Sequence, residues 1–255
     1  MVRLPRRLDH GEEATLGEHL EELRGRLFVM IGAIVFWTVV AYIFHDRVLD
    51  WLNGPLPPHE RLVTLGVAEP FTTTITVCIY AGLVAAFPVI LWQLWSFFAP
   101  AVEARSERKI LLLVACSVAL GAAGLAFGYA ILLPRAIHFL TNYNTEHFRN
   151  LIQAKPYYNF VVTVLVGVVV IFQTPLAILG LVAIGVLSSR TLRKQRRLGY
   201  LITAAIALAL PGPDLVTTFL ELIPMWLLFE ASIWLAVLYE RRRRKLAPNS
   251  ATLGA

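Results

Sequence analysis

The polar side chains of this chain do not assemble into an enzyme's catalytic group. The sequence contains no His-Glu-x-x-His, Gly-x-Ser-x-Gly, Walker or Gly-x-Gly-x-x-Gly motif, the patterns that hold zinc, activate a serine or cradle phosphates. Its six histidines, at positions 10, 19, 45, 59, 138 and 147, lack the spacing of metal ligands, and Cys78 and Cys116 form no redox or zinc pair. We therefore expect no catalytic residue, no metal site and no cofactor.

Two polar side chains stand instead inside apolar stretches, where such groups are costly unless they meet a partner or line a cavity. Gln173 lies two residues before Pro175, and Glu230 lies in the last apolar stretch. Gln173 could bond the backbone carbonyl that Pro175 leaves without a donor, or a polar group on a partner helix, which we favour. For the same reason, we expect Glu230 to contact a partner or to line a cavity. Together the two could also line the midplane site of a small secondary transporter.

The apolar stretches predict membrane-spanning helices. Of 255 residues, 57% are hydrophobic and 16% charged, with a mean hydropathy of +0.65, which is more apolar surface than one soluble core can bury. A spanning helix needs about 20 predominantly apolar residues. We therefore expect an all-α integral membrane protein with six transmembrane helices in one domain over residues 1–245, followed by a disordered tail at residues 246–255. The six stretches are residues 27–44, 71–95, 110–133, 160–187, 198–210 and 216–239.

The basic residues predict the orientation of these spans. Eighteen of the 23 Lys and Arg fall on one side of the six spans, which by the positive-inside rule is the cytoplasmic side. Both termini are then cytoplasmic, in a bacterial inner membrane, and the sequence pI near 9.6 reflects topology, so no nucleic-acid partner is expected. The basic run at residues 241–245 is interpreted as an anchor on anionic lipid. The outer side carries two sizeable loops, residues 46–70 and 135–158.

The fifth stretch is shorter than a bilayer. Residues 198–210 give 13 residues, about 20 Å of helix against a hydrocarbon layer of about 30 Å. Basic residues precede it, and the breaker run Pro-Gly-Pro-Asp at residues 211–214 follows it. We therefore expect a short hairpin of the fifth and sixth helices that locally thins the membrane. Pro88, Pro175 and Pro224 predict kinks in three of the spans.

Seven short segments carry a resemblance to a known family. In chain order, they are HLEELR at residues 19–24, AEPF at 68–71, FPVIL at 87–91, FFAPAVEARSERK at 97–109, PGPD at 211–214, IPM at 223–225 and FE at 229–230. In these segments, which together span nearly its whole length, the sequence resembles the TatC family, the multi-spanning receptor subunit of the twin-arginine protein translocase.

This resemblance implies a non-enzymatic subunit for Sec-independent protein transport. It would recognise the twin-arginine signal peptides of folded cargo proteins. It would also recruit single-span TatA-like or TatB-like subunits into a hetero-oligomer, with export driven by the proton-motive force. A small secondary transporter, or a membrane scaffold without cargo, is the alternative.

By position, the resemblance places signal-peptide recognition on Glu22 and Glu107, with Phe97 and Arg24 beside them. A carboxylate suits this role because it accepts the planar donor fork of a guanidinium at two points, which an ammonium cannot reproduce. The alternative is that Glu22 merely pairs with Arg26 one turn on, and Glu107 with local basic residues. Such pairs stabilise a helix by only about 0.2–0.5 kcal/mol.

The resemblance also places partner contacts within the membrane. Gln173 and Glu230 are the intramembrane polar candidates, and Thr217 and Thr218 open the sixth span where the family docks a partner helix. Many relatives carry a glutamate at the position of Gln173. Because this chain has a neutral amide there, we expect a hydrogen bond to a partner rather than a proton relay.

Overall fold

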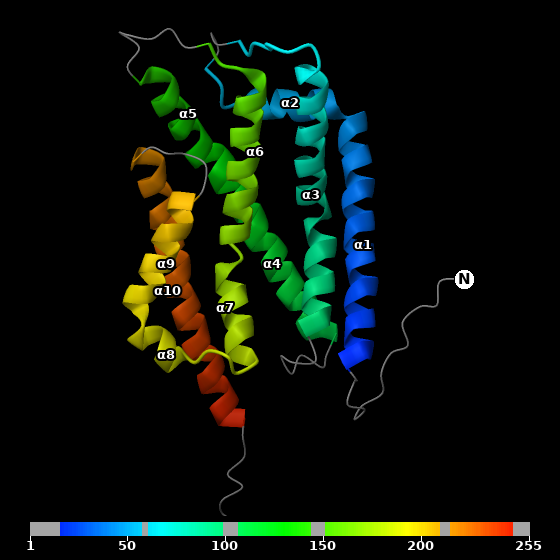
Figure 1. Ribbon diagram of the computed structural model, residues 1–255. Coiled ribbons are helices and arrows are strands. Elements are labelled where there is room, and N and C mark those ends of the chain that lie inside the picture. The colour runs from blue at the N-terminus through cyan, green and yellow to red at the C-terminus, as the bar shows by residue number, and fades with distance from the viewer. Residues whose placement is uncertain (1–15, 58–60, 99–106, 144–150, 210–214, 247–255) are drawn as a thin grey trace, which may run out of the picture.

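The described part of the chain is almost entirely helical. The computed structural model describes residues 16–57, 61–98, 107–143, 151–209 and 215–246, and Figure 1 shows their arrangement. The helices are α1 (Leu16–Ile43), α2 (His45–Asn53), α3 (Glu69–Phe98), α4 (Glu107–Phe127), α5 (Leu133–Asn142), α6 (Ala154–Ile171), α7 (Thr174–Ala183), α8 (Ser189–Lys194), α9 (Arg196–Ala209) and α10 (Leu215–Leu246), with a π-helical turn at Gly128–Leu132.

Five of the described helical segments are long and apolar enough to cross a membrane. They are Leu20–Ile43, Glu69–Phe98, Ile110–Asn142, Ala154–Ala183 and Thr218–Arg242. Each overlaps one of the predicted spans over most of its length, because hydropathy and length together decide which segments prefer lipid. The remaining predicted span corresponds to α9, a helix of 14 residues, about 21 Å long. The prediction that the fifth stretch is short is therefore consistent with the structure.

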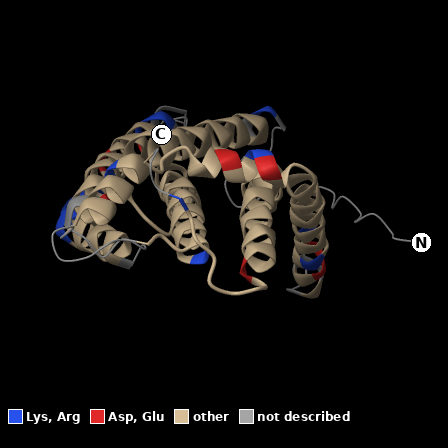
Figure 2. Ribbon diagram, turned by 90° about the horizontal axis from the view of Figure 1, so that it is seen from above, with Lys and Arg blue, Asp and Glu red and all other residues tan. Residues whose placement is uncertain are grey.

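The helices stand in a row rather than in a closed bundle. Helices α1, α3 and α6–α7 run side by side, while α4–α5 crosses behind them at an angle (Figure 1). Seen end-on, α1 stands at one edge and α9–α10 at the other (Figure 2). Helix α2 lies across one end of the row and α8 at the opposite end (Figure 1); these are called the α2 end and the α8 end below.

Close contact between α9 and α10 depends on a glycine. A Cβ added to Gly199 would lie 2.1 Å from the Phe229 ring, well inside van der Waals contact. Small residues let membrane helices approach closely, because packing rather than hydrophobic exclusion from water holds them together. The α9–α10 pair is thus built as a tight hairpin, and α9 stops well below the ends of α5 and α6 (Figure 1).

Two interruptions shape the middle of the chain. The π-helical turn at Gly128–Leu132 joins α4 to α5, and the sequence does not predict it. Phe172 and Gln173 separate the end of α6 from the start of α7. This interruption agrees with the kink expected at Pro175. Pro88 and Pro224 lie inside continuous α3 and α10.

The loop predicted at residues 135–158 is wrong in its extent. Helix α5 continues to Asn142 and α6 begins at Ala154. Tyrosines of the π-helical turn and of α6 bond the end of α2. Their hydroxyls donate from Tyr129 to the Trp51 carbonyl (2.7 Å), from Tyr157 to the Leu52 carbonyl (2.9 Å) and from Tyr158 to Asn53 Oδ1 (2.9 Å).

The sequence leaves open whether the first outer loop, which is rich in glycine and proline, is an ordered cap or a flexible segment. The last carbonyls of a helix have no partner within it, and at α2 the tyrosines supply donors. In its described residues the loop is therefore an ordered cap on the α2 end.

Candidate functional site

The carboxylate of Glu22 lies at the start of α1, at the α8 end, and it already binds a guanidinium. Arg26 donates to Glu22 Oε1 from Nε at 2.9 Å and from Nη2 at 2.6 Å. The same arginine reaches α3, where Nη1 donates to Gln93 Oε1 at 3.2 Å and to the Gln93 carbonyl at 3.5 Å. The side chains of Arg26 and Glu22 are 22% and 33% exposed. The pairing anticipated as the alternative role of Glu22 is therefore present, and it extends to a second helix.

The other predicted signal-peptide residues lie on elements that meet at the same end. Arg24 is exposed, with its guanidinium 5.7 Å from the centre of the Phe28 ring. Phe97, in the last turn of α3, is half-buried and packs edge-on against Phe98 at 5.3 Å. Glu107 is the first residue of α4, and its side chain lies outside the described residues. The start of α1, the end of α3 and the start of α4 all lie at the α8 end (Figure 1).

Gln173 connects the α6–α7 break to α4. Its Nε2 donates to the Ser117 carbonyl of α4 at 3.1 Å. The Ser117 hydroxyl, on a residue with no exposed surface, accepts a 2.8 Å bond from the Trp95 indole of α3. Side chains of α3 and of the α6–α7 break thus meet on one buried serine. An amide in this setting has an in-chain hydrogen bond, as a polar group in hydrocarbon requires.

The alternative considered for Gln173, a bond to the carbonyl freed by Pro175, is not the one that forms. Proline at position 175 removes the donor that would bond the Ile171 carbonyl. The Thr174 hydroxyl donates to that carbonyl at 2.6 Å, which leaves the Gln173 amide to bond α4. The break is therefore satisfied locally, and Gln173 contributes to packing between helices.

Glu230 has partners within the chain. It pairs with Arg196 at 3.1 Å and accepts a short hydrogen bond from the Tyr200 hydroxyl. All three belong to the α9–α10 hairpin, toward its α8 end. The glutamate therefore sits in a cluster at the beginning of α9. Thr218 is half-buried on α10, and the side chain of Thr217 lies outside the described residues.

The sequence analysis assigned no role to Glu69, a buried carboxylate. Glu69 is 8% exposed at the start of α3, at the α2 end. Its Oε2 accepts from the Leu65 and Gly66 amides at 2.9 and 3.1 Å, and its Oε1 accepts from Gln153 Nε2 at 3.0 Å and the Lys155 amide at 3.2 Å. It thereby ties the first outer loop to the start of α6. Its only signal in the sequence is the segment AEPF.

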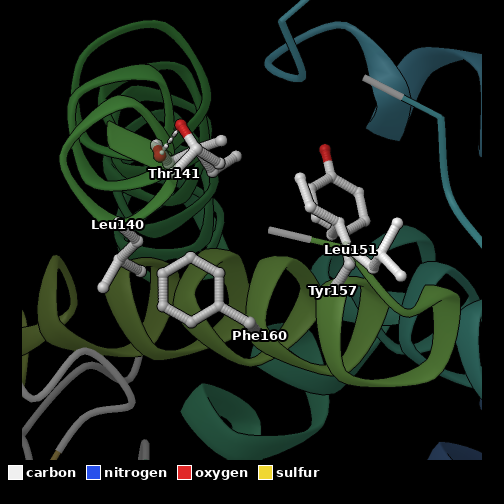
Figure 3. A pocket seen from close by; sticks show the side chains of 7 residues that line it. Leu140, Thr141, Leu151, Tyr157 and Phe160 are labelled. Carbon is white, nitrogen blue, oxygen red and sulfur yellow. Dashed lines mark hydrogen bonds between the residues drawn. The ribbon is translucent and has the colours of Figure 1, made fainter. Parts of the chain in front are cut away.

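A hollow of about 360 Å³ lies at the α2 end, between α5 and α6. Figure 3 shows it lined mainly by apolar side chains. Its polar groups are engaged, since the Thr141 hydroxyl donates to the Ile137 carbonyl and the Tyr157 hydroxyl to the Leu52 carbonyl. Its lining residues offer no carboxylate to a cationic ligand. The described residues also contain no group of three or more His, Cys, Asp or Glu able to hold a metal ion.

Comparison with known proteins decides the family. Residues 18–224 match the family described as Sec-independent protein translocase protein (TatC). The chain belongs to the TatC family. The family is one of non-enzymatic translocase components that work with other Tat subunits, so the expectation that this is not an enzyme is confirmed.

Relatives cover almost the whole chain. TatCd of Bacillus subtilis (strain 168) is 33% identical over 93% of this chain and 98% of its own length. TatC of Carboxydothermus hydrogenoformans is 32% identical over 87% of this chain and 92% of its own. The crystal structure of a twin-arginine translocase receptor, TatC, superimposes with a TM-score of 0.77 at 32% identity, covering 88% of this chain and all of that one.

Because the chain belongs to the TatC family, we discard the secondary-transporter alternative. That alternative needs Gln173 and Glu230 to share a midplane site. Gln173 bonds Ser117 of α4, whereas Glu230 bonds Arg196 and Tyr200 of α9. The two polar groups thus belong to separate clusters, and the chain is a Sec-independent protein translocase component with several membrane-spanning helices.

Proposed function

We propose that this chain is the receptor of its translocase for signal peptides with paired arginines. Glu22 and Glu107 accept the two guanidinium groups, with Phe97 and Arg24 beside them. The observation that carries the proposal is the Glu22 carboxylate, partly exposed at the α8 end and already accepting two bonds from a guanidinium. A site that binds Arg26 in this way has the chemistry to bind an arginine of a ligand. The similarity to a solved twin-arginine translocase receptor supports the same role.

A photocrosslinking experiment tests this proposal. A signal peptide with a photoreactive residue beside its arginine pair is expected to label the start of α1 and the start of α4 in the full chain in nanodiscs. The same peptide with a lysine pair should label them much less, because an ammonium cannot form the forked contact. Equal labelling by both peptides, or labelling confined to the α2 end, would contradict the proposal.

We further propose six transmembrane helices, with α9 as a short fifth, and both termini in the cytoplasm of a bacterial inner membrane. Helices α1 and α4 begin at the α8 end, and α8 and the end of α10 lie there (Figure 1). Because these segments carry most of the basic residues, the α8 end is then cytoplasmic. Reporter fusions after Ala255 and within residues 142–155 should report opposite sides of the membrane. Two fusions on the same side would rule out this topology.

The partners proposed are single-span TatA-like or TatB-like subunits, in a hetero-oligomer that uses the proton-motive force. Gln173, Glu230, Thr217 and Thr218 are the candidate contacts. At Gln173 the amide nitrogen is engaged with Ser117, and the amide oxygen can accept a bond from a partner's donor. Glu230 stands between α9 and α10, where a partner helix could lean on the short hairpin.

Substitutions at Gln173 test this partner contact. Gln173→Ala is expected to reduce partner recovery slightly, since interhelical bonds in membranes average about 0.6 kcal/mol. Gln173→Leu should reduce it more, because its bulk also disturbs packing around the Ser117 carbonyl. Gln173→Glu should be tolerated if the glutamate is protonated and donates to Ser117. Co-purification per folded chain, with the melting temperature as control, is the measurement. Full partner recovery and full export in both apolar variants would move the partner site to α10.

A further inference from the structure

Arg26 uses all three nitrogens of its guanidinium to connect two helices. Nε and Nη2 donate to Glu22 Oε1 on the preceding turn of α1, and Nη1 donates to Gln93 Oε1 and to the Gln93 carbonyl on α3. An ordinary pair one turn apart on an exposed helix leaves the arginine free to swing away. Here Gln93 fixes the arginine, and the arginine fixes the carboxylate.

The arrangement leaves half of the carboxylate available. Both bonds from Arg26 go to Oε1, and within the described residues no hydrogen bond reaches Oε2 of Glu22. A carboxylate has about four acceptor positions across its two oxygens. A second guanidinium can therefore bind Oε2 without displacing Arg26.

We propose that Arg26 is a positioning residue for signal-peptide recognition, and that Gln93 acts through it. Arg26 holds the Glu22 carboxylate in one orientation, with Oε2 presented to an arginine of the peptide. This inference rests on the proposed function, since it assumes that Glu22 contacts the peptide. The immobilised carboxylate loses less conformational freedom on binding, and such pre-organisation favours affinity.

If Arg26 instead competed with the peptide for Glu22, substituting Arg26 would change Kd in the opposite direction. Arg26 carries the same charge as the ligand, so if it merely occupied the site, its removal would strengthen binding. If it positions Glu22, its removal weakens binding even though a like charge is lost. The sign of the change in Kd for an Arg26 variant therefore distinguishes positioning from competition.

The experiment measures the Kd of a fluorescent twin-arginine peptide for the full chain in nanodiscs. Arg26→Gln and Gln93→Ala are each expected to weaken binding by about threefold to tenfold, in the range of coupling within one network. The double variant should be no weaker than Arg26→Gln, because Gln93 acts only through Arg26. Arg26→Lys should not restore affinity, since an ammonium cannot span Glu22 and Gln93 with a planar fork. The preference for an arginine pair over a lysine pair should fall in each variant.

Two controls keep the outcomes separate. Arg47→Gln removes the same charge at the α2 end, where Arg47 lies 5.6 Å from the centre of the Phe44 ring, and should leave Kd unchanged. Melting temperatures show whether each variant is folded. Tighter binding by Arg26→Gln overturns the inference, as do additive effects of the two substitutions. If Glu22→Gln weakens binding while folded Arg26 and Gln93 variants do not, this inference fails and the proposed function stands. If Glu22→Gln has no effect, both fail at this residue.

Discussion

A twin-arginine signal peptide is expected to lose at least about 100-fold in affinity when Glu22 or Glu107 is replaced by lysine. Each carboxylate is proposed to form charged hydrogen bonds worth about 1.5–3 kcal/mol, and lysine adds like-charge repulsion to their loss. The glutamine variants keep the shape and lose only the charge, so they should bind about tenfold to 100-fold more weakly. Equilibrium binding of the peptide to the full chain in nanodiscs gives these numbers.

Glu21→Lys is the matched control for this pair of variants. Glu21 is exposed, and neighbouring helical residues point about 100° apart, so its charge reversal changes the net charge equally without touching the Glu22 carboxylate. Its effect on Kd should be small and should fall with added salt. A Glu21 variant as damaged as the other two would indicate a diffuse electrostatic attraction instead of a defined site. Unchanged binding in folded Glu107→Lys would refute its assignment.

The sequence predicts the spans well because lipid imposes one strong and local requirement. A helix in hydrocarbon needs about 20 apolar residues and tolerates few charges, so hydropathy alone locates α1, α3, α4–α5, α6–α7 and α10. The shortness of α9 likewise follows from counting the 13 residues between Arg197 and Pro211. The π-helical turn at Gly128–Leu132 has no comparable local signal.

Contacts between distant residues are less accessible from sequence. Pro175 predicts a broken helix, yet it does not indicate that Thr174 would bond the freed carbonyl, or that Gln173 would reach Ser117, 56 residues earlier. The Glu22–Arg26 pair could be anticipated from its spacing, whereas its extension to Gln93 depends on how α1 packs on α3. The four donors to Glu69 come from the first outer loop and from the start of α6, so only the folded chain brings them together.

Leucine at position 82 is expected to separate α1 from α3. A Cβ added to Gly82 would lie 2.4 Å from Thr38 Oγ1, 2.6 Å from the Thr38 nitrogen and 2.7 Å from its Cα. Two of these are backbone atoms, which cannot rotate out of the way. Helix α1 packs mainly on α3, so few other contacts would hold it in place. Overpacking a tight contact typically costs about 1–3 kcal/mol, and the larger side chain should lower the melting temperature by several degrees.

This substitution also connects the fold to the proposed site, because the bond between Arg26 and Gln93 exists only while α1 lies against α3. Gly82→Leu should therefore weaken twin-arginine peptide binding even though residue 82 is remote from the carboxylates. Gly32→Leu on α1 is the matched control, since a Cβ there meets no atom within 4 Å, and it should leave both melting temperature and Kd near their original values. If Gly82→Leu lowered stability and left Kd unchanged, Glu22 would be positioned within α1 alone, and its link to α3 would play no part in recognition.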